Sequence, residues 1–142
     1  MENRYCLQMV SCGDGCGGGG GSAAENVYSI EETVCGKWID GKTIYRKVIS
    51  AKLAKDSGNS IVFANVSDLK IDRVIELYGN LLDEVSNTQS VLQTSSNRTD
   101  GLFAAINMFY GNETGNIHYH YLNNHGYYSG CTAYVVLEYT KK

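Results

Sequence analysis

Short apolar runs separated by turn-forming segments recur from residue 26 to the end of the chain, and this pattern is the strongest constraint on its fold. The runs are rich in β-branched and aromatic residues, which favours strands. They lie at residues 32–39, 42–49, 60–64, 71–79, 89–93, 102–110, 116–121 and 133–139. Their spacing predicts an all-β fold, a jelly-roll-like antiparallel β-sandwich of about seven or eight strands. For residues 72–77 a short helix is the alternative, and we expect strand.

The amino-acid composition agrees with strands and tight turns. The 142-residue chain contains 16 glycines, 11 tyrosines and no proline. Tyrosine is favoured on half-buried pleated surfaces, and glycine supplies the positive-φ positions that tight turns need. Hydrophobic residues make up 43% and charged residues 19%, so the chain has enough apolar material for the core of one domain. The net charge of -3 argues against a nucleic-acid partner, because phosphate contacts require a basic surface.

A glycine tract divides the chain. Residues 11–22 read SCGDGCGGGGGS, and residues 17–21 offer no side chains to a core. Such a tract is typical of a flexible linker. It lacks the Lys-Ser or Lys-Thr ending that a phosphate-binding loop requires. We therefore expect an N-terminal arm with its glycine-rich linker at residues 1–25 and a β-sandwich domain at residues 26–142.

The first residues and the cysteines indicate where the chain folds. Residues 1–10 carry polar and charged side chains in place of the apolar stretch of a secretory signal, so we expect synthesis in a cytoplasm. No run approaches the roughly 20 apolar residues of a bilayer-spanning helix, which argues against membrane insertion. The five cysteines are odd in number, which favours a reducing compartment over a disulfide framework. We expect Cys35 and Cys131 to pack as small hydrophobic side chains.

The clearest local feature is a hairpin formed by residues 32–39 and 42–49. The Asp40-Gly41 pair between them predicts a two-residue type I′ turn. In the second arm, both faces mix apolar and charged side chains. One face carries Ile44, Arg46 and Val48, and the other carries Tyr45, Lys47 and Ile49. We expect such a strand to be covered on both sides, by a second sheet or by a neighbouring chain.

The same hairpin carries a family resemblance. Residues 37–47 read Lys-Trp-Ile-Asp-Gly-Lys-Thr-Ile-Tyr-Arg-Lys and form the core of a segment at residues 28–49. This segment resembles one that recurs in small structural proteins of bacteriophages and prophages of gut Firmicutes, proteins of the tail, fibre or receptor-binding type. Residues 66–75 and 132–141 resemble two further strands of the same family. The resemblance extends over residues 26–142.

The resemblance implies a virion component, a β-sandwich that forms a homotrimer at the end of a fibre or on the particle surface. It implies no enzymatic activity and contributes no catalytic residue. The motif residues Trp38, Asp40, Gly41, Tyr45 and Arg46 would be mainly architectural. The N-terminal arm would attach the domain to other virion proteins. The alternatives are an adhesin module that binds carbohydrate or protein, and a capsid decoration or adaptor protein.

His118 and His120 are separated by one residue, which puts them on one face of a strand. Three kinds of metal site are conceivable for this pair. They are a zinc enzyme, a structural metal within the chain, and an iron or zinc ion on a trimer axis, where three copies would supply six nitrogens. The simpler alternative is a pair of solvent-facing histidines interleaved with Tyr119 and Tyr121. We expect this simpler arrangement and no cofactor.

Tyrosines and asparagines gather in the last third of the chain. Rigid tyrosine rings beside asparagine amides suit the binding of a sugar or a protein partner. The loop at residues 123–130 is therefore the leading candidate for contact with a host-surface glycan or protein. Its candidate contact residues are Asn123, Asn124, His125, Tyr127 and Tyr128. In the alternative interpretation, the tyrosines fill the sandwich core or the trimer interface.

Overall fold

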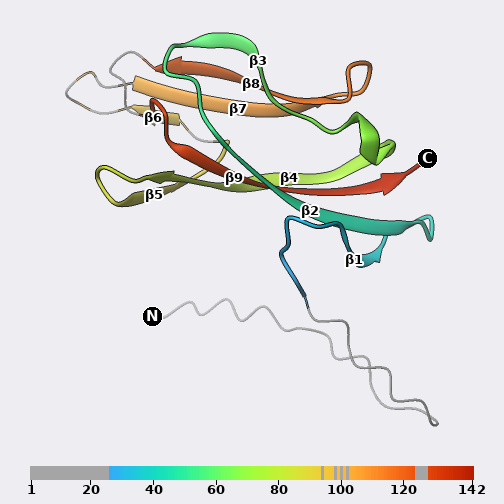
Figure 1. Cartoon of the computed structure of the whole chain (residues 1–142). Coiled ribbons are helices and arrows are strands. Elements are labelled where there is room, and N and C mark those ends of the chain that lie inside the picture. The colour runs from blue at the N-terminus through green and yellow to red at the C-terminus, as the bar shows by residue number, and fades with distance from the viewer. Residues whose placement is uncertain (1–25, 94, 98, 100, 102, 124–127) are drawn as a thin grey trace, which may run out of the picture.

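The computed structural model describes residues 26–142 except residues 94, 98, 100, 102 and 124–127. In the described part, nine strands form two antiparallel sheets that lie over each other as two layers (Figure 1). The expected fold class, an antiparallel β-sandwich, is confirmed. The N-terminal arm at residues 1–25 lies outside the described residues, so its boundary with the domain stays a prediction.

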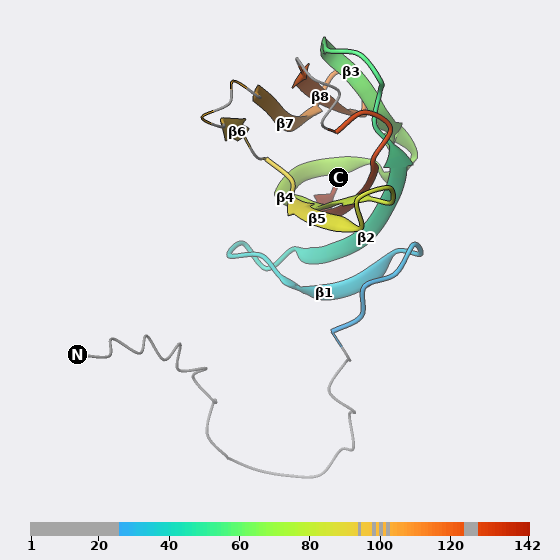
Figure 2. The same cartoon turned by 90° about the vertical axis from the view of Figure 1, so that its left-hand side faces the viewer.

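The first sheet has five strands and is strongly curled, with the second sheet above it (Figure 2). In order across the sheet, its strands are β1 (Thr33–Lys37), β2 (Thr43–Lys52), β9 (Thr132–Lys141), β4 (Ile71–Asp83) and β5 (Thr88–Val91). The strands of the second sheet are, in order, β3 (Gly58–Asn65), β8 (Asn116–Asn123), β7 (Phe103–Gly111) and β6 (Ser95–Asn97). A short 3-10 turn, η1 (Ser67–Leu69), links β3 in one sheet to β4 in the other.

The core lies between the two sheets and is centred on β9. This strand pairs with β2 on one side and with β4 on the other, so its backbone is hydrogen-bonded along both edges. Its alternate residues Ala133, Val135, Leu137 and Tyr139 are fully buried. The second sheet adds the inward-facing residues Ile106, Met108, Ile117, Tyr119 and Tyr121. The alternation of buried and exposed positions along β8 is that of a strand with one face in the core.

Residues 71–79 form part of β4, so strand is confirmed there and the helical alternative is wrong. The strand contains a glycine at a position of close backbone approach. A Cβ added at Gly79 would lie 1.9 Å from the backbone oxygen of Tyr134 in β9. Since no real Cβ tolerates such a distance, the packing of β4 against β9 requires glycine at this position.

The short strand β6 was not marked by any apolar run. It pairs with the first residues of β7, opposite Ala104 and Ala105. Further along β7, the side-chain amide of Gln93 takes the place of a neighbouring strand. Its Nε2 donates to the carbonyl of Met108 at 2.6 Å, and its Oε1 accepts from the N–H of Met108 at 2.7 Å. The edge of β7 is thus satisfied in part by a side chain.

The hairpin between β1 and β2 forms as expected, but its turn differs from the predicted one. The N–H of Trp38 donates to the carbonyl of Lys42, and the N–H of Gly41 donates to the carbonyl of Trp38, both at 2.8 Å. These bonds enclose a three-residue loop, in which Gly41 has φ of +87° and Asp40 has no positive φ. The two-residue type I′ turn is therefore wrong. The hydrogen bonds and the single left-handed glycine are those of a type I turn followed by a bulge.

Both faces of β2 are covered, as its mixed pattern predicted. Tyr45 and Ile49 pack against the core on the inner face. The outer face is covered by the residues that lead into β1. The carbonyl of Ser29 accepts the N–H of Val48 at 2.8 Å, and the ring of Tyr28 lies over the guanidinium of Arg46. The outer cover is thus a segment of the same chain, in addition to the expected second sheet on the inner side.

Candidate functional site

Arg46 is buried on the outer face of β2 and is paired with a carboxylate. Its Nε and Nη2 atoms lie 2.8 Å and 2.7 Å from Oε1 of Glu138, and the two side chains are only 9% and 13% exposed. The guanidinium carbon lies 4.4 Å from the centre of the Tyr28 ring, and Nη1 donates to Asn26. Burial lowers the pKa of Arg46, but the hydrogen bond and charge of Glu138 outweigh it and the pKa is raised. Arg46 therefore anchors the segment before β1 to the sheet.

Tyr45 belongs to a second cluster, on the core side of the sheet. Its ring stacks on Tyr139 with centres 6.0 Å apart, and the ammonium of Lys141 lies 4.5 Å from its centre. Tyr139 donates to Glu32, which also pairs with Lys141 at 2.6 Å. Burial alone raises the pKa of Glu32, but the hydrogen bonds from Lys141 and Tyr139 outweigh it and hold the pKa below 4.5. These contacts are structural.

The remaining motif residues shape the first hairpin. Trp38 is half-buried, and its backbone closes the loop described above. The Asp40 carboxylate accepts the N–H of Lys42 at 3.0 Å. Gly41 supplies the left-handed position of the loop. Together with Arg46 and Tyr45, these residues hold the hairpin in one conformation.

Exposed apolar side chains are concentrated on this hairpin and on the segment before it. We call residues 27–39 the apolar edge, because β1 is the outermost strand of its sheet. Its exposed side chains, with their exposed fractions, are Val27 (43%), Tyr28 (55%), Ile30 (69%), Val34 (59%) and Ile39 (90%). An outermost strand with exposed apolar side chains is a typical interface for another chain.

His118 and His120 lie on the exposed face of β8, as expected from their spacing. Phe109 of β7 lies beside both, with ring centres 5.5 Å from His118 and 4.9 Å from His120. The ring nitrogens of His118 lie 3.2 Å from the carbonyl oxygen of Ser60 and 3.1 Å from Oγ1 of Thr114. The Nδ1 atom of His120 accepts the N–H of Ser60 at 3.1 Å. The two histidines therefore fasten β8 to β3 and to the β7–β8 turn.

The described residues place no third metal-ligating side chain beside His118 and His120. Among the described residues, no three side chains of the His, Cys, Asp or Glu type are grouped so that they could hold a metal ion. His118 uses both of its ring nitrogens in hydrogen bonds to the chain itself. An iron or zinc ion on a trimer axis stays a hypothesis about the assembled protein.

The predicted contact loop is described only at its two ends. Asn124, His125 and Tyr127 lie outside the described residues. The amide of Asn123 donates to the hydroxyl of Tyr121 at 2.5 Å. Tyr128 is 5% exposed and belongs to the core cluster. The Tyr128 ring therefore fills the core, as in the alternative interpretation, in which the tyrosines fill the sandwich core or the trimer interface.

Of the two described cysteines, Cys131 packs in the core as a small apolar side chain, as expected. Cys131 is buried in the core, and the half-buried Cys35 lies with its sulfur 3.6 Å from the carbonyl oxygen of Ile44. Burial raises the pKa of both thiols. Within the described ranges, no helix is long and apolar enough to cross a membrane.

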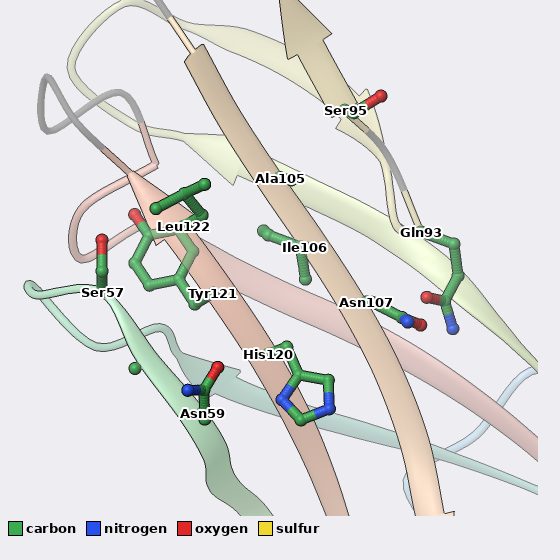
Figure 3. A pocket seen from close by; sticks show the side chains of 11 residues that line it. Ser57, Asn59, Gln93, Ser95, Ala105, Ile106, Asn107, His120, Tyr121 and Leu122 are labelled. Atoms are coloured by element: carbon green, nitrogen blue, oxygen red, sulfur yellow. The ribbon is translucent and has the colours of Figure 1, made fainter.

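A hollow of about 670 Å³ lies on the exposed face of the second sheet (Figure 3). It crosses all four strands, and the lining residues are Ser57, Gly58, Asn59, Gln93, Ser95, Ala105, Ile106, Asn107, His120, Tyr121 and Leu122. Sequence reasoning missed Asn59 and Asn107. Asn107 of β7 is the cross-strand partner of His120 in β8. Asn59 lies in β3, the other neighbour of β8, at the register shift between Gly58 and Ile61. The one available signal was the single asparagine within the apolar run of β7.

Comparisons of the chain with protein-family models, with curated proteins and with solved structures found no match.

Proposed function

We propose that this protein is a structural component of a bacteriophage particle and that it assembles as a homotrimer through the apolar edge. The observation that carries the assembly proposal is the gathering of exposed apolar side chains on residues 27–39. The motif resemblance of residues 28–49 supports the virion role, and it falls on the same part of the chain. In this proposal, the motif builds a surface for subunit contact.

The apolar edge has the properties of a contact surface. Arg46, which is paired with Glu138, holds the segment before β1 against the sheet through Tyr28 and Asn26. Its outermost strand pairs on one side only, with β2. A head-to-tail ring of copies would bury this edge against another surface of the next copy and would close with three subunits. The N-terminal arm, which precedes the edge directly, would attach the ring to other virion proteins.

Paired valine substitutions test the assembly role. Val34 and Val91 lie on the two opposite outermost strands of the same sheet and are 59% and 68% exposed. We expect Val34→Lys to shift the sedimentation of the full chain from trimer to monomer, and Val91→Lys to leave the trimer intact. Circular dichroism would verify that both variants fold. Dissociation of the Val91 variant alone, or of neither variant, would rule out assembly through this edge.

The virion role is tested on particles. Antibodies raised against the purified chain should label phage particles induced from a lysogen that carries the gene, and electron microscopy should place the label on the tail or its fibres. Label on the head would favour the decoration or adaptor alternative. Particles without label, together with free chain in the lysate, would overturn the virion role.

A further inference from the structure

We propose that the hollow on the exposed face of the second sheet binds a neutral saccharide, with Asn59, Asn107 and His120 as its hydrogen-bonding residues. This inference does not rest on trimer assembly or on the virion role. The hollow lies on the second sheet, whereas the apolar edge belongs to the first, and its lining residues lie outside the predicted contact loop.

The hydrogen-bonding groups of the hollow are available. The side-chain amides of Asn59 and Asn107 are exposed and make no hydrogen bond to any described residue. His120 accepts the N–H of Ser60 through Nδ1, so the proton of its neutral ring is on Nε2 and can be donated. An amide both donates and accepts, which matches the hydroxyl groups of a sugar. Figure 3 shows Asn59, Asn107 and His120 on three neighbouring strands of one face.

Hydrogen bonds hold the backbone of the strands around these groups. Ser57 bonds the backbone of Asn123 in both directions, at 2.8 Å and 3.3 Å, and so ties the start of β3 to the end of β8. The side-chain amide of Gln93 makes two hydrogen bonds to the backbone of Met108, the residue next to Asn107. A site whose walls are held in this way loses little conformational entropy when a ligand binds.

The charge of the hollow selects the ligand class. Its lining residues include no Asp, Glu, Lys or Arg among the described part of the chain. The neighbouring hollow, around His118 and Phe109, does include a carboxylate, Glu113. An uncharged lining offers no compensation for a buried phosphate, sulfate or carboxylate, which disfavours an anionic ligand. Neutral hydroxyl groups match the amides and the imidazole.

The apolar surface of the hollow is complementary to the C–H face of a sugar ring. Leu122 is 51% exposed on β8 and lies opposite Ala105 of β7. At the other end, the flat ring of His120 lies with its centre 4.9 Å from that of Phe109, which lines the neighbouring hollow. Flat rings and aliphatic side chains beside amide groups form the mixed surface that small polar ligands require.

The test is a nuclear magnetic resonance titration of the full chain with defined oligosaccharides. The neutral probes are hexasaccharides of glucose, galactose, mannose and N-acetylglucosamine, and the charged probe is a galacturonic acid hexasaccharide. We expect at least one neutral probe to shift the amide signals of residues 105–107 and 120–122 in a saturable way, and the charged probe to leave them unchanged. Shifts with the charged probe only, or with no probe, would overturn the proposal.

Variants separate this site from general surface binding. Asn107→Ala and Asn59→Ala should each weaken binding about tenfold, because each removes hydrogen bonds to the ligand. The matched control is Asn80→Ala, an exposed asparagine on β4 of the other sheet, which should bind as the unmodified chain does. The amide spectrum of each variant reports whether it is folded. Equal affinity of the Asn107 and Asn80 variants would overturn the proposal.

Discussion

Arg46 illustrates how one charged side chain in a strand determines what must cover that strand. The guanidinium lies on the outer face of the sheet and is nevertheless buried, because Glu138, Tyr28 and Asn26 surround it. A buried charge requires a partner, so the segment before β1 is held in place by electrostatics as well as by the backbone bond from Val48 to Ser29.

Removal of the partner carboxylate should be costly. We expect Glu138→Gln to lower the free energy of unfolding by about 3 kcal/mol, since it leaves the Arg46 charge buried and unpaired. Urea denaturation followed by circular dichroism measures this. The control is Lys42→Ala, whose ion pair with Asp72 is exposed, and we expect it to unfold as the unmodified chain does. If Glu138→Gln lowers the free energy of unfolding by less than about 1 kcal/mol, the Arg46–Glu138 pair contributes no more than an exposed surface ion pair.

Glu32 makes stability depend on pH. Burial works against its charge, but Lys141 and Tyr139 hold its pKa in the folded chain below the ordinary value of 4.5. Its contribution to stability is therefore fully present above 4.5 and is lost as the pH falls through the lower folded-state pKa. Glu32→Gln should flatten the acid side of a plot of melting temperature against pH, whereas Glu113→Gln, in an exposed turn, should not. If the melting temperature of the Glu32→Gln variant falls at acid pH as steeply as that of the unmodified chain, this role of Glu32 is contradicted.

At the scale of the elements, β4 and β9 approach each other closely at Gly79. We expect Gly79→Ala to destabilise the fold by about 3 kcal/mol or more, because its Cβ would overlap the backbone oxygen of Tyr134, which cannot move without breaking the sheet. Gly36→Ala in β1 is the control, since only Ile44 lies near, at 4.0 Å. Thermal denaturation compares the two. Equal melting temperatures would show that β4 and β9 can separate without loss.

The elements were predictable where the residues inside each one determine its structure. The apolar runs located the strands, and residues 71–79 were correctly assigned because β-branched and aromatic residues favour strand. The turn at Asp40 was wrong because the pairing of Trp38 with Lys42 sets the loop at three residues, and dipeptide preference does not reveal that register. The strand β6 depends on pairing with β7, and the Gln93 amide completes that edge from outside any strand.

At the scale of the whole molecule, the site was less predictable than the fold. The sequence pointed to the loop at residues 123–130, which is described only at its ends and stays a prediction, although Tyr128 lies in the core. The hollow that we propose as a saccharide site combines Asn59 with Asn107 and His120, positions that only the strand order brings together. The apolar edge follows from the same topology, which leaves β1 outermost. The exposure of an apolar side chain depends on which strands lie beside its own strand. The sequence of a single segment does not reveal those neighbours.

The mass of the full chain in solution tests the central proposal most directly. Light scattering coupled to size-exclusion chromatography should give three times 15.6 kDa at micromolar concentration, because the proposed assembly through the apolar edge would close as a ring of three copies. The mass should stay constant over a range of loaded concentrations above the dissociation constant. A mass of 15.6 kDa at every concentration would contradict the account, since the apolar edge would then remain exposed in the isolated protein.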